Sequence, residues 1–388
     1  MKIGFSIAVY DKFEELEVCV DIIKNNFNKF NSVICVGTNN PDARMILENN
    51  SLIDFIVDGE DLKQKEHTSK KRFNVSVADS AVSVMRTASN TFASVNKLIE
   101  TDVDYIVTLH SDSWILNQDK LLNLIELMKQ KNRPFAFRDL NIHLSGIFST
   151  SMSPYLIDFF MIMDRKFIEK NNIFNHDTYS LLPGFMNNVH TMFYYLIAIK
   201  IEWKNTLCYS THKNFQFWDG EPVYYNKYLA PYCYDPFMDQ VHINIGSFFD
   251  NLGQALQAQM LIKYKFKGNV INKFIDKYSM NDDELQKKLF DYDNKYSKKL
   301  KWLGMNFKLY GLSRSHSYIE KSLSLKQNIL KLLIRMITVR IVHKKNEQCY
   351  IDYIKDRINQ QDLLDNNHFL WHDEIFLSKQ DQDYIESK

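Results

Sequence analysis

The sequence predicts an α/β fold in which a mainly parallel sheet is sandwiched between helices, followed by a helical C-terminal region. Three observations predict it. Short apolar runs alternate with amphipathic stretches of helical length over the first 140 residues. The 388-residue chain is 45% hydrophobic, enough to bury a large core. From about Phe248 onward the pattern is helical and charged, without further strong strand signals.

The strand and helix signals follow one another in order. Runs rich in β-branched and aromatic residues predict strands at 2–10, 32–38, 52–58, 105–110 and 134–140. Amphipathic stretches predict helices at 13–27, 75–100 and 118–131. Helices that connect successive strands form crossovers, and crossovers favour parallel pairing.

The second part of this domain is less regular. Residues 155–174 combine strand-like pieces with a short helix, and a longer helix is expected through 184–201. The segment from Thr206 to Gly246 contains three prolines and many aromatic residues, and we expect it to be irregular. A loop-rich region beside an α/β sheet commonly forms a wall of the substrate site.

We place a domain boundary between Tyr264 and Asn272, which divides the chain into domains 1–265 and 266–388. Within the second domain, residues 323–345 put Leu and Ile at helical intervals with Lys and Arg among them. Such a basic amphipathic helix can make a peripheral contact with an anionic membrane. The other interpretation is a helix packed on the domain with a solvated basic face.

Composition narrows the class of protein. A net charge of +1 offers no basic face for nucleic acid. The five cysteines contain no C-x-x-C pair, which argues against a disulfide framework and a structural zinc site. The N-terminus lacks the pattern of a signal peptide. We therefore expect a cytoplasmic protein, at the inner face of the cytoplasmic membrane if residues 323–345 bind lipid.

Polar residues stand where the strand at 105–110 ends. His110, Ser111 and Asp112 follow this buried strand, and a helix begins soon after them. Ligands of open α/β sheets bind at the carboxyl ends of the strands. A carboxylate such as Asp112 is a hard oxygen ligand for Mg²⁺ or Mn²⁺, and such an ion neutralises phosphate charge.

Three segments, in the right order, resemble the GT-A glycosyltransferases of the bacterial family 2 type. They are "FSIAVYDKFEELEVCVDII", "IVTLHSDSWILNQDKL" and "FFMIMDRKFIEKNNIF". The first looks like the opening strand and helix of that family, the second like its D-x-D strand, and the third like its acceptor-side segment. The resemblance covers roughly residues 3 to 175, and it implies the GT-A fold and a nucleotide-sugar donor.

The chain departs from the family pattern at several places. Ala8 replaces a proline, "GTNN" at 37–40 replaces an acidic pair that holds the base, and His110 replaces the first carboxylate of D-x-D. An imidazole suits Mg²⁺ less well than a transition ion. The cofactor is therefore Mn²⁺ or Mg²⁺, and a metal-independent enzyme remains an alternative.

The resemblance also implies which residues bind the nucleotide and the metal. The expected nucleotide contacts are Ala8, Val9, Tyr10, Thr38, Asn39, Arg86, Asn90 and Ser111. Arg86 would pair with a phosphate, or alternatively form a surface salt bridge. The expected metal ligands are His110 and Asp112, with His242 as a third ligand and His212 as an alternative to it.

The general base is harder to identify, because the Glu-Asp pair of the family is missing. A base must accept the proton of the acceptor hydroxyl. The candidates are His190, Asp219, Glu221 and Asp239. Two of them lie in "FWDGEP", where Trp218 could stack on a sugar ring or simply anchor the loop.

The leading hypothesis is a glycosyltransferase that moves a sugar from a nucleotide-sugar donor to a glycan or lipid-linked acceptor, in bacterial capsule or lipopolysaccharide synthesis. One alternative is a nucleotidyltransferase, which would normally have a glycine-rich basic loop directly after the first strand; "AVYDKFEEL" is not such a loop. Another is a glycan-binding or scaffolding protein that kept the fold but lost catalysis.

Overall fold

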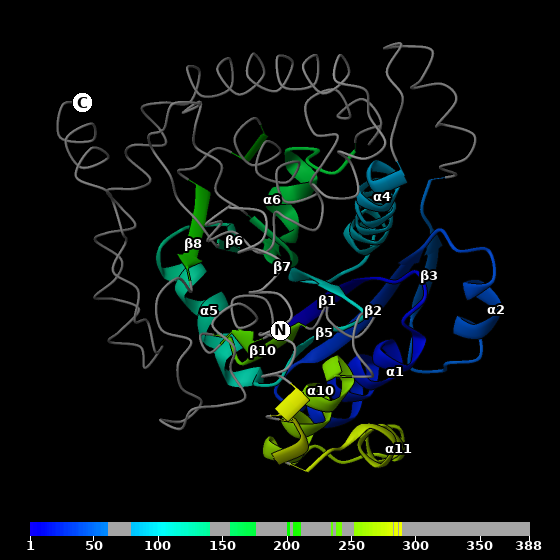
Figure 1. Cartoon of the computed structure of the whole chain (residues 1–388). Helices are drawn as coiled ribbons and strands as arrows, with labels where there is room; N and C mark the ends of the chain where they lie inside the picture. The colour runs from blue at the N-terminus through cyan, green and yellow to red at the C-terminus, as the bar shows by residue number, and fades with distance from the viewer. Residues whose placement is uncertain are drawn as a thin grey trace, which may run out of the picture.

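The computed structural model describes residues 1–60, 79–139, 156–175, 200–201, 205–210, 234–235, 238–242, 252–281, 283–285 and 287–288. These residues form a seven-stranded sheet with helices on both faces and a second, three-stranded sheet (Figure 1). The predicted α/β fold with a mainly parallel sheet is confirmed.

The large sheet has the strand order β3-β2-β1-β4-β7-β6-β8. In chain order its strands are β1 (Lys2–Ala8), β2 (Asn31–Thr38), β3 (Phe55–Asp58), β4 (Tyr105–His110), β6 (Phe135–Asp139), β7 (Leu156–Asp164) and β8 (Thr206–Ser210). Both pairings of β7, with β4 and with β6, are antiparallel, and the other pairings in this sheet are parallel. Among the strands that the structure describes, β7 therefore runs against the rest of the large sheet.

The order of the strands reverses beside β1. The chain builds outward from β1 to β2 and β3, and then crosses back to add β4 on the other side of β1. Such a reversal leaves a crevice outside the carboxyl ends of the two central strands, where ligands of open α/β sheets bind. Ala8 and His110, the last residues of β1 and β4, are paired at this point.

Helices cover the two faces of the sheet. They are α1 (Phe13–Asp21), continued by a π-helix (Ile22–Asn26), α2 (Ala43–Leu47), α4 (Asp79–Ile99), α5 (Gln118–Gln130), α6 (Arg165–Lys170), α10 (Leu252–Lys263) and α11 (Asn269–Tyr278). In Figure 1, α4 lies on one side of the central strands, and α1, α10 and α11 lie on the other.

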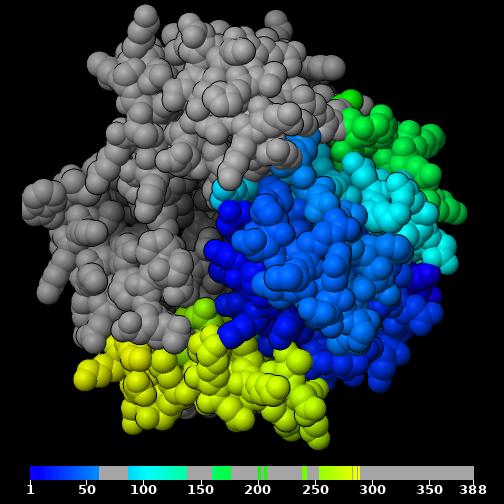
Figure 2. Space-filling view, turned by 90° about the vertical axis from the view of Figure 1, so that its right-hand side faces the viewer, coloured from blue at the N-terminus to red at the C-terminus, as the bar shows by residue number. Residues whose placement is uncertain are grey.

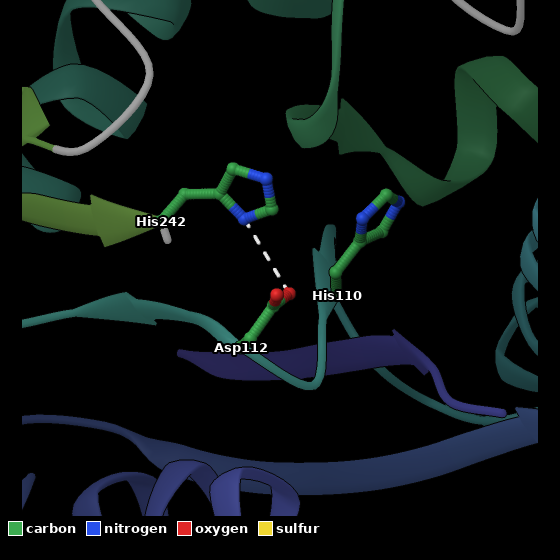
Figure 3. Close-up of side chains that lie close together, drawn as sticks. All are labelled: His110, Asp112 and His242. Atoms are coloured by element: carbon green, nitrogen blue, oxygen red, sulfur yellow. Dashed lines mark ion pairs between the residues drawn. The ribbon is translucent and has the colours of Figure 1, made fainter. Parts of the chain in front are cut away.

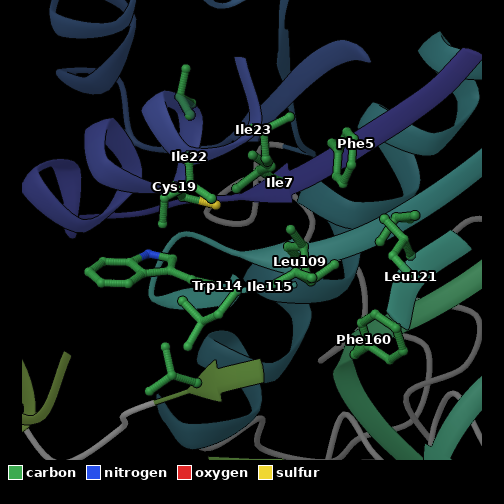
Figure 4. Close-up of a cluster of buried hydrophobic side chains, with 14 of the residues drawn as sticks. Phe5, Ile7, Cys19, Ile22, Ile23, Leu109, Trp114, Ile115, Leu121 and Phe160 are labelled. Carbon is green, nitrogen blue, oxygen red and sulfur yellow. The ribbon is translucent and has the colours of Figure 1, made fainter. Parts of the chain in front are cut away.

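The alternation of β1 side chains explains how both faces are filled. Ile3, Phe5 and Ile7 are fully buried and join the core with apolar residues of α1 and α5 (Figure 4). The intervening Ser6 points to α4, where its hydroxyl lies 2.6 Å from that of Ser94. Because side chains of a strand alternate between faces, one strand can serve both layers.

The second sheet comprises β5 (Ser113–Ile115), β9 (Tyr234–Asp235) and β10 (Gln240–His242). Trp114 of β5 is fully buried and anchors this sheet to the rest of the domain. Its indole N–H donates to the carbonyl oxygens of Glu15 and Ser111, each at 3.0 Å, and its ring packs edge-on against Phe274.

The expectation that residues 206–246 are irregular is wrong in part. The described residues of this segment include β8, which pairs parallel to β6, and β9 and β10 of the small sheet. Strands β9 and β10 are two and three residues long, so they are too short to show a period of two in the sequence. Pairing makes them strands: β10 pairs with the distant β5, and β9 pairs with β10.

Helices α10 and α11 pack on the first domain. Ile271 and Phe274 of α11 belong to the same hydrophobic core as Phe5 of β1. Figure 2 shows the yellow-green residues of α10 and α11 along the lower edge of the molecule, below the blue N-terminal residues. The domain boundary after residue 265 stays a prediction, because residues 289–388 lie outside the described part, as does the basic helix at 323–345.

In the part that the structure describes, no helix is long and apolar enough to cross a membrane.

Replacement of Gly37 tests the close approach of α4 to β2. A Cβ at Gly37 would lie 2.2 Å from the backbone oxygen of Asn90, so the helix or the strand would have to move. We expect Gly37→Ala to lower the free energy of unfolding by about 3 kcal/mol in urea titrations. Gly4→Ala is the matched control, because the nearest atoms to its Cβ would be side-chain atoms of Leu98 and Val103, the closest at 3.0 Å, and we expect a loss of about 1 kcal/mol. Equal losses in the two variants would contradict this packing.

Candidate functional site

Three of the predicted site residues meet at the carboxyl edge of the sheet. His110 ends β4, Asp112 follows two residues later, and His242 ends β10. One potential ligand atom from each lies within 4.8 Å of the other two. Figure 3 shows the side chains of Asp112 and His242 pointing toward each other, with His110 beside them. The structure thus gathers residues separated by up to 132 positions in the sequence, the interval from 110 to 242.

Backbone contacts hold Asp112 in place. The chain leaves β4 through a turn in which the N–H of Ser111 donates to the carbonyl oxygen of Ala8 at 3.1 Å. The side-chain amide of Gln257, on α10, donates to the carbonyl oxygen of Asp112 at 3.1 Å. The connection is therefore fixed from the sheet on one side and from α10 on the other.

Strand pairing delivers His242 to the same place. β10 runs antiparallel to β5, and His242 is paired with Ser113, the residue next to Asp112. Two residues earlier in β10, the side-chain amide of Gln240 donates to the hydroxyl of Ser113 at 2.6 Å. His242 is thus positioned by a ladder rather than by a loop, which limits its freedom to move away.

Asp112 is a buried carboxylate with two basic neighbours. It is 4% exposed, and burial alone would raise its pKa. One carboxylate oxygen forms an ion pair with the ammonium of Lys12, and the other lies 3.4 Å from Nδ1 of His242. These neighbours outweigh the burial and hold the pKa of Asp112 well below its usual range. The carboxylate is therefore ionised at neutral pH.

His242 has the opposite balance. Burial lowers the pKa of its imidazole, and the nearby Lys12 and His110 lower it further, while Asp112 raises it. The net shift is downward, so the ring is neutral at neutral pH. The ring of His110 meets that of His242 edge-on, with centroids 5.8 Å apart. Neutral imidazoles have lone pairs to offer a metal ion.

The donor set fits a divalent transition ion. Imidazole nitrogens and carboxylate oxygens bind such ions at about 2.0–2.2 Å, so the ligand atoms of a tetrahedral site are about 3.4 Å apart. The ligand atoms of this cluster lie within 4.8 Å of one another, and side-chain movements of about an ångström would bring them to that spacing. Two imidazoles with one carboxylate suit a first-row transition ion better than Mg²⁺.

Lys12 was not identified from the sequence. It is the last residue before α1, and its ammonium reaches Asp112 across 100 positions of sequence. Only the pairing of β1 with β4 brings the two connections together. The one signal available beforehand was a lysine placed directly after the first strand, at the edge where a ligand was expected.

The predicted nucleotide contacts from the first two strands converge on Asn90. Its side-chain amide donates to the carbonyl oxygen of Val9 at 3.3 Å and to the side-chain oxygen of Asn39 at 3.4 Å. Asn39 in turn donates to the hydroxyl of Ser89 at 3.2 Å. These contacts tie the ends of β1 and β2 to α4. Thr38 is fully buried, and its hydroxyl accepts from the N–H of Asn40.

Tyr10 and Arg86 form the outer part of this region. The guanidinium of Arg86 lies 4.3 Å from the centre of the Tyr10 ring, which is the geometry of a cation–π contact. Tyr10 is 38% exposed, so the ring still presents surface to solvent. The stacking arrangement is an addition to the two roles expected for Arg86 from the sequence.

Asp239 is engaged with the helix α5. One oxygen of its carboxylate lies 3.0 Å from the ammonium of Lys120, and the other accepts from the side-chain amide of Asn117 at 3.0 Å. Asn117 is the N-cap of α5. Asp239 itself has a φ of 48°, in the left-handed region. Its carboxylate therefore ties the turn before β10 to α5, and its role as a base stays a prediction. The other candidate bases, His190, Asp219 and Glu221, lie outside the described residues, as do His212 and Trp218.

The chain was compared with protein families, curated proteins and solved structures, and distant structural likenesses were found. No protein-family model and no curated protein matches the chain. Among solved structures, it is similar to a galactosyltransferase, LgtC, in complex with donor and acceptor sugar analogues, with 12% identity, a TM-score of 0.31, and coverage of 54% of this chain and 73% of that chain. It is also similar to a 4-diphosphocytidyl-2C-methyl-D-erythritol synthase from Anaerococcus prevotii, with 10% identity, a TM-score of 0.29, and coverage of 55% and 90%. At these TM-scores neither likeness carries an argument.

Asp239→Asn tests whether this carboxylate is structural. The variant loses the charge that pairs with Lys120 but keeps an oxygen that can accept from Asn117. We expect thermal or urea unfolding to show a loss of about 1–2 kcal/mol. Lys120→Met should cause a similar loss, since it removes the other half of the pair. An Asp239→Asn protein of unchanged stability would contradict this structural role.

Proposed function

We propose that this chain is a GT-A glycosyltransferase that uses a nucleotide-sugar donor. The observation that carries the proposal is the cluster of His110, Asp112 and His242 beside the reversal point between β1 and β4. This is where an open α/β sheet binds a nucleotide. The cluster also holds the type of donor atoms that a cation-bridged diphosphate requires. The sequence resemblance over residues 3 to 175 supports the same function.

The proposed donor lies along the edge of the sheet. Its diphosphate is placed beside Asp112, and its base lies over the ends of β1 and β2. Tyr10 offers a partly exposed ring to the base, and Arg86, held against this ring, offers a positive charge to the phosphates. Asn90 keeps the two strand ends in register with each other.

A divalent ion held by His110, Asp112 and His242 would neutralise charge on the leaving diphosphate. The protein's own contribution is to keep Asp112 ionised and His242 neutral, so that both can act as ligands. Burial of Asp112 and His242 limits screening by water and strengthens the charge interactions there. The ion would be Mn²⁺ rather than Mg²⁺, because two of the ligands are imidazoles.

The base that activates the acceptor hydroxyl is proposed among residues outside the described part of the chain. We propose His190, Asp219 or Glu221 as the base that takes the proton of the acceptor hydroxyl. The acceptor would be a glycan or a lipid-linked sugar in bacterial surface polysaccharide synthesis. In this proposal residues 323–345 contact the inner face of the cytoplasmic membrane.

A screen of donors tests the proposal directly. We expect one of UDP-, GDP-, CMP- or dTDP-sugars to raise the melting temperature by several degrees, and to raise it further with Mn²⁺, because a ligand that binds only the folded state stabilises it. Asp112→Ala should remove the metal-dependent part of the shift. No shift with any donor would instead favour the glycan-binding scaffold, and release of pyrophosphate from a nucleoside triphosphate would favour the nucleotidyltransferase.

His110→Asp tests the choice of metal. It replaces an imidazole by a carboxylate, the ligand that Mg²⁺ prefers. We expect the variant to keep donor binding while its preference moves from Mn²⁺ toward Mg²⁺, measured as the ratio of the thermal shifts with the two ions. An unchanged ratio would mean that His110 does not touch the ion.

A further inference from the structure

Lys12 lies in the candidate metal site without being a possible ligand. Its ammonium is paired with Asp112, the one carboxylate of the His110, Asp112 and His242 cluster. An ammonium carries three donors and no lone pair, so it cannot bind a metal ion. Lys12 therefore supplies a positive charge at the place where the proposed function requires a divalent cation.

The two cations compete for one carboxylate. The oxygen of Asp112 that does not contact Lys12 lies 3.4 Å from Nδ1 of His242, so an ion between His242 and Asp112 would sit within a few ångströms of the Lys12 ammonium. Like charges at this distance repel strongly where burial limits screening by water and salt. Asp112 is 4% exposed, so the repulsion is not relieved by solvent.

Lys12 has the means to withdraw. Its side chain is 28% exposed, so one part of it borders solvent although its ammonium is paired with a buried carboxylate. The flexible four-carbon side chain of a lysine lets its ammonium move through several ångströms without any change in the backbone. A nearby anion would give the displaced ammonium a new partner. The diphosphate of the proposed donor, placed beside Asp112, is such an anion.

We propose that Lys12 is a gate for the metal: its ammonium takes the place of the ion at Asp112 in the metal-free protein, leaves when a divalent cation binds, and then pairs with the donor diphosphate. Metal and donor consequently favour each other's binding, because each stabilises the position of Lys12 that the other requires. The competition rests only on the metal cluster, whereas the pairing with diphosphate rests on the proposed function.

Binding of Mn²⁺ alone tests the competition. We expect calorimetry, or electron paramagnetic resonance of free Mn²⁺, to show weak binding to the wild type and a dissociation constant at least about tenfold lower in Lys12→Met. Lys12→Arg keeps the charge and should bind as weakly as the wild type. Lys24→Met is the matched control, because it removes a part-buried lysine paired with Asp54 far from this edge, and it should change nothing. Equal or weaker binding by Lys12→Met would overturn the gate.

A measurement on the wild type covers the case in which Lys12→Met does not fold. An amine-reactive reagent, with peptides counted by mass spectrometry, should modify Lys12 slowly in the metal-free protein and several times faster with Mn²⁺. The ammonium of Lys24 provides the internal reference, since its rate should not depend on Mn²⁺. A rate of Lys12 modification that does not change with Mn²⁺ would overturn the proposal.

Adding UDP to the labelling experiment tests the pairing of Lys12 with diphosphate separately from its competition with the metal ion. We expect UDP together with Mn²⁺ to protect Lys12 again, because the diphosphate now engages the ammonium. Acceleration by Mn²⁺ without protection by UDP would overturn the pairing with diphosphate while the competition stands. A UDP-induced thermal shift in that same sample would show that the donor site exists and that only the role of Lys12 is wrong; no shift with any nucleotide would count against the proposed function.

Discussion

The site depends on one buried carboxylate, Asp112. An ionised carboxylate away from water is stable only with positive or hydrogen-bonding partners, and removal of one partner of a buried pair costs about 3–5 kcal/mol. This is a large share of the about 5–15 kcal/mol that stabilises a typical folded domain. Lys12 meets the requirement as a cation, and Nδ1 of His242, from a different part of the chain, lies 3.4 Å from the other carboxylate oxygen. The charge of Asp112 therefore constrains the connection after β1 as well as the position of β10.

The small sheet of β5, β9 and β10 holds the residues around Asp112 in place. β5 begins directly after Asp112, and buried Trp114 fixes β5 to the connection after β4 and to α1 through its two hydrogen bonds. Because β10 pairs with β5, the packing of Trp114 also determines where His242 lies. A loop could not hold a neutral imidazole this close to a carboxylate and a second histidine with the same constancy.

Lys12 lies beside the cluster of His110, Asp112 and His242, whose side chains are of the kind that bind metal ions. Asp112 can therefore pair either with the Lys12 ammonium or with a metal ion. A protein that needed only structural charge balance would have no use for two imidazoles beside the Lys12–Asp112 pair. A site built only for metal would have no use for the lysine. Both sets of groups occur at the same edge of the sheet, within reach of the region where Tyr10 and Arg86 present an aromatic ring and a positive charge. The combination is suited to an anionic ligand that arrives with its own counterion.

The sequence by itself determined the parallel part of the sheet and the position of His110 and Asp112, because these depend on local hydrophobic periods and on the rule that ligands bind at the carboxyl ends of strands. Only the tertiary structure decided that Lys12 pairs with Asp112, that Asp239 is bound to α5, and that β10 is a strand at all. The physical reason is that each of these features consists of a contact between groups about 100 or more positions apart. Neither partner carries a local signal of the other, whereas a buried strand or an amphipathic helix shows its period in its own residues.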